Sequence, residues 1–484
     1  MLAKPQPSER DFSEEKTDWK AIIICALINF ASYFVSVTLS VACWPYIKVL
    51  DPLVPVYLNG VNRAMMKLSH AFGTGFFSVH AYSSRRFRKT LIIGRLLLLA
   101  GLVLYLSIEI FPVSFRRYIF LIVFSLQSIA DGSNIVFRSY IPLVSTMKDR
   151  QKAYSVMAAS EIVAVISGPV IQLISAKLDE RGIEVFFDTF RLNQFTVPLW
   201  IMLLIHYASL YIITFHFEDP DCTETQRERE KSVFILEDLK GAFQQLKLLD
   251  FRLIVFCLLA KNMASIGNTV ISTLMAPYLI ATMNDSNYTA YLSIGTIITG
   301  VVSIIAVGIL ISTPLSKKVP STVLFPFSLL CYFLLYAGLA IPWPGITQSV
   351  PVKSDENPYG CDQSELKWCD NIQVVHPWGF IGFDSLLFGV SLPIAAISFD
   401  TIYSKILGSV NQNIMQGIYK ILNDLTMVGI PMGATALFSA LGPTITWGIT
   451  AGLIVLGFLL WIPVYIKVSK MKDEEDTNDS SEQK

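Results

Sequence analysis

The chain has 484 residues, of which 53% are hydrophobic and only 16% are charged, well below the roughly 25% charged residues of an average soluble domain. The 38 basic and 38 acidic side chains cancel, so no global field favours nucleic acid or an acidic substrate. Apolar runs of about 20 residues recur along the chain, as membrane-spanning helices require. The composition therefore excludes an ordinary soluble protein and predicts an all-α membrane protein.

The apolar runs predict about twelve membrane-spanning helices, divided equally between the two ends of the chain. The predicted spans lie at residues 21–46, 57–80, 90–112, 118–144, 153–176 and 197–216, and then at 251–282, 288–312, 320–342, 378–403, 412–440 and 443–467. A polar segment at 217–250 separates the two sets and contains a stretch typical of an amphipathic surface helix. We therefore expect two six-helix bundles, over residues 21–216 and 251–467, between tails at 1–20 and 468–484.

The charges of the short loops predict which side of the membrane each loop faces. Lys and Arg gather after the second, fourth and eighth spans, as the positive-inside rule expects of cytosolic loops. They include Arg85, Arg86, Lys148, Arg150, Lys317 and Lys318. Arg116 and Arg117 in the third loop oppose this assignment, but the majority supports it. Because the number of spans is even, both termini are predicted to be cytosolic.

Two loops on the predicted non-cytosolic side carry features that agree with this orientation. Asn284 and Asn287 each begin a glycosylation sequon in the loop after the seventh span. Cys361 and Cys369 lie together in the long ninth loop, in a space that permits disulfides. We expect these two cysteines to pair, with two free thiols as the alternative.

The fifth and eleventh spans, which occupy matching positions in the two halves, both contain Gly and Pro. Gly168 and Pro169 lie in the fifth span, and Gly429 and Pro431 lie in the eleventh. Pro frees a backbone carbonyl, and Gly allows a neighbouring helix to approach closely. The repetition predicts helices that bend or slide against each other, although Gly and Pro are also frequent in ordinary membrane helices.

Ionisable side chains inside the spans are expected to mark function, since each costs about 2.5 kcal/mol or more at the bilayer centre. In the second span, Arg63, Lys67 and His70 have the spacing of one helical face. Such a basic stripe would attract anions. Alternatively, Arg63 and Lys67 extend to the membrane surface and hold the helix in position.

The fourth and fifth spans carry further acidic and basic side chains inside the membrane. Asp131 and Arg138 are two turns apart in the fourth span, and they either serve transport or form a structural salt bridge. Glu161 in the fifth span is expected to pair with Arg138 or a basic residue of the second span, or to bind a proton. The sequence supports each of these roles for Glu161.

The second half holds further ionisable candidates in its spans, at Lys261, Asp384, Asp400, Lys405, Lys420 and Asp424. Lys261 lies nearest the interior and is assigned to the ion pathway. Lys420 and Asp424 are four residues apart, so we expect them to neutralise each other as a structural pair. Asp400 and Lys405 lie near the cytosolic end of the tenth span, where they are expected to act in gating or as a surface anchor.

Several of these features together resemble the major facilitator superfamily. They are the polar turn and basic cluster with Arg85 and Arg86, the span-four arginine Arg138, and the Gly-Pro pair of the fifth span. The resemblance covers almost the whole chain and implies two six-helix bundles around a central cavity, with Arg138 in substrate binding or proton coupling. The stretch 78–81 departs from the family pattern because it has no acidic residue before the basic cluster. That loss fits a channel-like gate.

A narrower likeness to one branch of the superfamily lies in three motifs. They are residues 403–408 after the tenth span, 359–369 in the ninth loop, and 132–140 in the fourth span. The likeness implies residence in endosomal or lysosomal membranes and an association with chloride conduction there. We therefore expect a transporter of anions such as chloride.

Two alternatives remain, a proton-coupled carrier of a sugar or amino acid and a receptor or scaffold that transports nothing. The chain has no Walker loop, HExxH motif or Gly-x-Ser-x-Gly elbow, so no enzymatic activity, cofactor or metal is predicted. The expected partners are a small anion or small polar solute, protons and membrane lipid, without nucleic acid, and a monomer is favoured.

Overall fold

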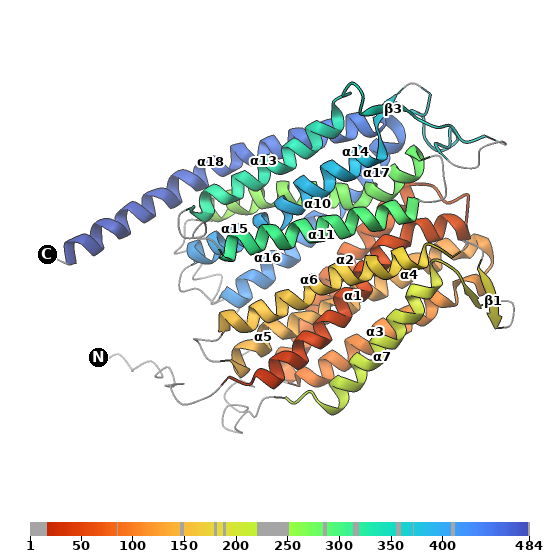
Figure 1. Ribbon diagram of the computed structural model, residues 1–484. Coiled ribbons are helices and arrows are strands. Elements are labelled where there is room, and N and C mark those ends of the chain that lie inside the picture. The colour runs from red at the N-terminus through yellow and green to blue at the C-terminus, as the bar shows by residue number, and fades with distance from the viewer. Residues whose placement is uncertain are drawn as a thin grey trace.

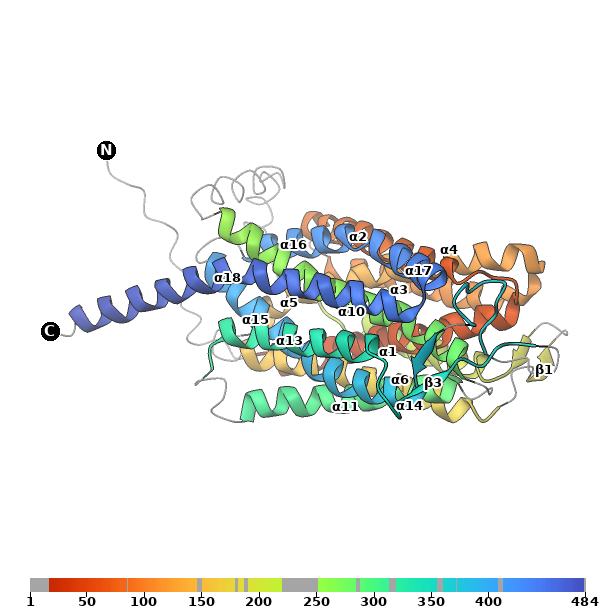
Figure 2. The same ribbon diagram turned by 90° about the horizontal axis from the view of Figure 1, so that it is seen from above.

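The computed structural model describes residues 17–84, 86–145, 150–178, 182–186, 190–219, 251–283, 288–312, 319–354, 360–370, 372–407 and 412–482. Its helices lie alongside one another, with short β-hairpins at one end of the bundle (Figures 1 and 2). We call this end the hairpin side. The opposite end, where α1 begins and α18 ends, is the tail side.

The first half of the chain forms helices that cross the bundle back and forth. These are α1 (Trp19–Leu50), α2 (Tyr57–Ser84), α3 (Phe87–Leu106), α4 (Val113–Asp131), α5 (Ile135–Val144), α6 (Arg150–Ser175) and α7 (Thr196–Phe215). Short 3₁₀ turns lie at η1 (Ile108–Ile110) and η2 (Gly132–Asn134). Asp18 caps α1 because its side chain accepts a hydrogen bond from the backbone N–H of Ala21, at 3.0 Å.

The second half repeats this arrangement. Its helices are α10 (Phe251–Thr282), α11 (Tyr288–Ser312), α13 (Ser321–Ala340), α14 (Pro377–Phe383), α15 (Gly389–Leu407), α16 (Gln412–Thr426), α17 (Gly429–Leu441) and α18 (Pro443–Glu482). A π-helical segment, η3 (Asp384–Phe388), joins α14 to α15. α18 continues well beyond the predicted end of the last span at residue 467, through a stretch rich in Lys and Glu, which favour helix.

Each predicted span corresponds to helix in the structure, and three of the spans are interrupted. The fourth is divided by η2, the tenth contains η3, and the eleventh is divided between α16 and α17. Among the described residues, ten segments are long and apolar enough to cross a membrane. α2, which carries the basic stripe, and α6 are not among the ten, and they pack against these more apolar helices. The all-α membrane fold is therefore confirmed.

Two antiparallel hairpins lie on the hairpin side. One pairs β1 (Ile183–Phe186) with β2 (Phe190–Leu192), and the other pairs β3 (Thr347–Ser349) with β4 (Gln373–Val375). Cys361 and Cys369 form a disulfide between β3 and β4, the pair that the sequence analysis singled out. We call residues 360–370 the disulfide loop.

The two halves meet mainly through two helix pairs, α2 with α17 and α6 with α11. The α2–α17 crossing is close because Gly60 has no side chain. A Cβ added to Gly60 would lie 2.2 Å from the Thr435 hydroxyl and 2.6 Å from the Pro431 carbonyl oxygen. Small residues allow membrane helices to approach in this way.

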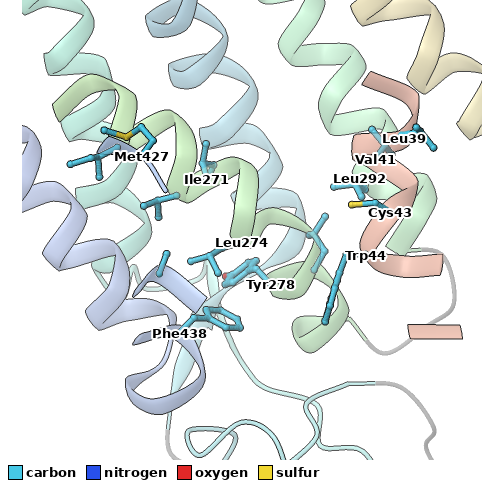
Figure 3. Close-up of a cluster of buried hydrophobic side chains, with 14 of the residues drawn as sticks. Leu39, Val41, Cys43, Trp44, Ile271, Leu274, Tyr278, Leu292, Met427 and Phe438 are labelled. Carbon is cyan, nitrogen blue, oxygen red and sulfur yellow. The ribbon is translucent and has the colours of Figure 1, made fainter. Parts of the chain in front are cut away.

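A buried apolar cluster connects the halves on the hairpin side (Figure 3). It includes Trp44 of α1, Leu274 and Tyr278 of α10, Leu292 of α11 and Phe438 of α17. Trp44 is 1% exposed and Phe438 is 0% exposed. Because these side chains come from both halves, any movement that separates the halves here must expose them.

Candidate functional site

An ion pair joins the two halves on the hairpin side. Lys48 in the last turn of α1 places its Nζ 2.6 Å from Oε1 of Glu365 in the disulfide loop. A pocket of about 180 Å³ lies beside this pair, and its lining includes Trp44, Lys353 and Asp362. Both signs of charge therefore line the pocket, with Trp44 as an apolar wall.

The disulfide loop keeps an ionised carboxylate at this pocket. Asp362 accepts hydrogen bonds from the Ser364 hydroxyl at 2.6 Å and from the Ser364 backbone N–H at 3.0 Å. It also pairs with Lys353 Nζ at 3.2 Å. The Ser364 hydroxyl, followed by its N–H and Lys353, holds the pKa of Asp362 below its ordinary value. Asp362 therefore stays ionised in mildly acidic solution.

Arg63 of α2 lies deeper, against α1. Its Nη1 donates to the Ser40 hydroxyl at 3.3 Å, and its Nη2 approaches the Ser40 carbonyl oxygen at 3.5 Å. Among the described residues, no carboxylate lies within ion-pair distance of Arg63, and its buried Nε has no hydrogen-bond partner. Ser40, Trp44 and Lys48 are spaced by four residues on α1, so Arg63 lies one turn below Trp44.

Lys67 and His70 of α2 share a carboxylate from the other half. The Lys67 Nζ lies 3.6 Å from Oδ1 of Asp424 in α16, and His70 Nδ1 lies 2.7 Å from Oδ2. The Asp424 side chain is 8% exposed, whereas Lys67 is 37% exposed. The expectation that Asp424 is neutralised by Lys420 in its own helix is thus incomplete. Lys420 lies within electrostatic range of Asp424, but the contacts of Asp424 with α2 connect the two halves.

Asp131 ends α4 near the basic stripe. Ser36 of α1 donates its hydroxyl to Oδ2 of Asp131 at 2.7 Å, while the buried Oδ1 has no hydrogen-bond partner. His70, Arg95 and Lys420 all lie within electrostatic range of this carboxyl group. Basic side chains from α2, α3 and α16 therefore lie around Asp131.

The predicted alignment of Asp131 with Arg138 assumed a continuous α-helix. The structure interrupts that helix with the 3₁₀ turn η2, where Gly132 lies directly against the backbone of Gly73 and Thr74 in α2. The Arg138 side chain lies outside the described part of the chain, so the predicted pairing of Asp131 with Arg138 stays a prediction.

Arg95 of α3 is a charged residue that the sequence analysis missed. It is 0% exposed, and its Nη2 donates to Asn134 Oδ1 at 3.0 Å and to the Ile28 carbonyl oxygen at 3.4 Å. His206 of α7 lies 3.0 Å from the Arg95 carbonyl oxygen. A single Arg in an otherwise apolar span was the available signal, since intramembrane charges mark functional sites by default.

Glu161 of α6 faces α1 within the first half. The side-chain amide of Asn29 donates to Oε1 of Glu161 at 3.3 Å and to the Ser160 hydroxyl at 3.1 Å. Asn29 is 2% exposed. This contact places Glu161 beside a neutral amide of α1, and its predicted role in binding a proton stays a prediction.

Lys261 of α10 contacts its own half rather than the first. Its Nζ lies 3.5 Å from the Ala395 carbonyl oxygen and 5.3 Å from the centre of the Phe399 ring, both in α15. Asp400, also in α15, lies within electrostatic range. These contacts bring Lys261 together with Asp400, which the sequence had assigned to a different role.

Some predicted residues lie outside the described part of the chain. These are Arg85, Asn284 and Asn287, the side chains of Arg138 and Lys405, and most of the predicted linker 217–250. Arg86 immediately precedes α3 and is exposed, and its carbonyl oxygen accepts a hydrogen bond from the Thr90 N–H at 3.2 Å.

The Gly-Pro pairs of the two halves differ in structure. Gly168 lies against α1, where an added Cβ would be 2.6 Å from the Thr38 hydroxyl, and α6 continues through Pro169 without a break. Gly429 has open space around it and begins α17 directly after the break in the eleventh span. The helix-flexing role predicted for these positions, Pro431 included, stays a prediction.

These observations agree with comparisons to known proteins. The family model of the Major Facilitator Superfamily matches residues 25–352. A curated relative, major facilitator superfamily domain-containing protein 8 of Xenopus laevis, is 23% identical over 487 residues, covering 93% of this chain and 92% of the relative.

Solved transporter structures share the fold. The nucleoside transporter NupG superposes with a TM-score of 0.58 at 13% identity, covering 92% of this chain and 99% of that one. A D-xylose-proton symporter superposes with a TM-score of 0.63 at 14% identity, covering 92% and 97%. The chain belongs to the Major Facilitator Superfamily and is a multi-pass membrane transporter.

Proposed function

We propose that this transporter moves small anions such as chloride along the face of α2 that carries Arg63 and Lys67. The observation that carries the proposal is the environment of Arg63, whose guanidinium faces a serine and has no carboxylate partner among the described residues. A cation held at membrane depth without a counter-charge attracts an anion. Pairing the two charges offsets part of the free energy that each of them loses on leaving water.

Other cations extend this route in both directions. Lys48 and Lys353 line the pocket on the hairpin side. Trp44, which also lines it, lies one turn from Ser40 on α1, and Lys67 follows Arg63 one turn deeper on α2. Each of Lys48, Lys353 and Lys67 has a carboxylate partner. Arg63 is therefore the strongest candidate for holding the anion, with Lys67 as the next residue along the route.

We further propose an endosomal or lysosomal membrane, with both termini in the cytosol and the hairpin side in the lumen. The Cys361–Cys369 disulfide supports this orientation, because disulfides persist in oxidising compartments and are rare in the cytosol. The motifs shared with the endosomal and lysosomal branch of the superfamily support the same location.

The test is anion flux through the full chain in proteoliposomes, with chloride exchanged for gluconate. Arg63→Gln keeps hydrogen-bonding groups and removes the charge, so we expect chloride flux to fall roughly tenfold or more, the value of one charge-assisted hydrogen bond. The control is Lys20→Gln, which removes an exposed cation at the start of α1 and should leave flux within twofold of the unmodified protein.

Three results would overturn the proposal. Equal loss in both variants would show that net charge rather than Arg63 matters. Flux of a sugar or amino acid that stops in Glu161→Gln, with no chloride current in the unmodified protein, would establish a proton-coupled carrier instead. If the unmodified protein carries no flux of chloride, sugar or amino acid above that of protein-free vesicles, the chain acts as a receptor or scaffold.

A further inference from the structure

Asp384 is a buried carboxyl group in the second half that the anion route does not use. It is 2% exposed and begins the π-helical segment η3, seven residues into the membrane-spanning segment that starts at Pro377. At 1.5 Å per residue, this places Asp384 about 10 Å from the hairpin side. π-Helical turns inside α-helices occur frequently at functional sites.

No cation faces Asp384 from the helices packed around it. η3 packs against α11, α13, α14 and α15. The sequences of α11, α13 and α14 contain no Asp, Glu, Lys, Arg or His, and the charged residues of α15 lie near its other end. The phenols of Tyr332 and Tyr336 in α13 lie within electrostatic range of Asp384, and neither can supply a positive charge.

The hydroxyl groups around Asp384 leave it short of donors. Thr299 Oγ1 lies 3.4 Å from Oδ2 of Asp384 but only 2.9 Å from the Gly295 carbonyl oxygen. A hydroxyl has one hydrogen, so it serves one of these acceptors at a time. The neighbouring Ser385 donates to the same Gly295 oxygen at 3.2 Å, and Oδ1 of Asp384 has no hydrogen-bond partner.

A proton on the carboxyl group resolves this shortage. The protonated acid donates to Thr299 Oγ1, which continues to donate to Gly295, and no charge remains buried. An ionised Asp384 would instead carry an uncompensated charge at membrane depth, which is costly. The arrangement therefore stabilises the protonated form and resists the ionised form until the surrounding helices separate.

We propose that Asp384 is a proton-binding site of the second half, loaded from the hairpin side and emptied when α11 and α13 move apart during transport. The site makes anion movement sensitive to pH, so this role rests on the proposed function. The anion route in the first half and the proton site in the second half are built from different residues, which allows each to be removed alone.

The first experiment needs no transport. Infrared difference spectra of the purified full chain, recorded between acidic and alkaline pH, should contain, among the bands of the other acids, a C=O stretching band of the protonated Asp384 carboxyl group, shifted in heavy water. Asp384→Asn should remove this band, and Thr299→Val, which removes the hydroxyl partner, should shift its frequency. Asp370→Asn, which changes an exposed acid of the disulfide loop, should leave the band unchanged.

The second experiment measures chloride flux in proteoliposomes as a function of pH on the hairpin side. Asp384→Asn mimics the protonated acid permanently, so we expect it to abolish most of the pH dependence, while Asp370→Asn retains it. If the infrared band depends on Asp384 but no chloride moves, the proton site stands and the anion function fails.

Three outcomes overturn the proton site. The first is a set of carboxyl bands that is identical in the unmodified protein and in Asp384→Asn. The second, which decides the question if Asp384→Asn does not fold, is a band unmoved by Thr299→Val. The third is a band that disappears when sodium is added at constant pH, because the site would then bind a metal cation.

Discussion

Asp424 of α16 connects the two halves of the transporter through its contacts with α2. The Asp424 carboxylate is 8% exposed, and it contacts two basic side chains of the opposite half, His70 and Lys67. Removing it leaves two basic groups without their counter-charge, whereas either basic group removed alone leaves the other in place. The contact therefore depends more on Asp424 than on Lys67 or His70.

We predict that Asp424→Asn lowers the stability of the folded protein by about 1.5–3 kcal/mol, the value of hydrogen bonds to a charged group. The measurement is the midpoint temperature of unfolding in detergent, compared with Lys67→Gln and with the exposed control Asp370→Asn. We expect the largest decrease for Asp424→Asn. A decrease no larger than that of the control would show that the contacts with α2 contribute nothing to stability.

At the scale of the element, α2 is the helix on which both halves depend. It carries the basic stripe, contacts α4 within its own half and packs against α17 of the other half. Two of its three glycines, Gly60 and Gly75, differ in surroundings. Gly60 lies against Thr435 and Pro431, while nothing lies within 4 Å of a Cβ added to Gly75.

We predict that Gly60→Val forces α2 and α17 apart, while Gly75→Val, on the same helix, leaves the crossing intact. In Gly60→Val, the added side chain overlaps the Thr435 hydroxyl and the Pro431 backbone. A helix backbone cannot turn aside as a flexible side chain can, so the helices must separate. Accessibility of Thr435→Cys to a water-soluble thiol reagent measures the separation. We expect faster labelling with Gly60→Val only, and equal rates in both backgrounds would contradict the close crossing.

At the scale of the whole molecule, the halves are held together on the hairpin side by the Lys48–Glu365 pair and by the apolar cluster around Trp44 (Figure 3). Alternating access in this kind of fold moves one half against the other. The disulfide loop carries Glu365, so the Cys361–Cys369 disulfide limits how far that loop can follow a moving half.

We predict that linking Lys48→Cys to Glu365→Cys with a short thiol-specific cross-linker stops transport by holding the hairpin side closed. Cleaving the linker should restore flux. The single-cysteine variants treated with the same reagent are the controls, and they should retain flux. Undiminished flux in the fully cross-linked protein would show that transport requires no separation at this contact, as in a channel with a fixed opening.

Much of this structure could be predicted from the sequence because its determinants are local. An apolar run of about 20 residues has few alternatives to a spanning helix in lipid, so the spans were predictable. The spacing of Arg63, Lys67 and His70 is likewise a property of one helix, and Cys361 and Cys369 were the only pair of cysteines in a polar loop.

Only the tertiary structure decided which side chains meet across helices. His70 and Asp424 are 354 residues apart, and nothing in the periodicity of either helix indicates their contact. Packing between neighbouring helices also buries Arg95. The same packing accounts for the 3₁₀ turn after Asp131 and the π-helical turn at Asp384. The sequence by itself thus determined where the apolar helices lie and which of them carry charge, because hydrophobicity acts along the chain. The pairing of those charges depends on how the helices pack, and so required the structure.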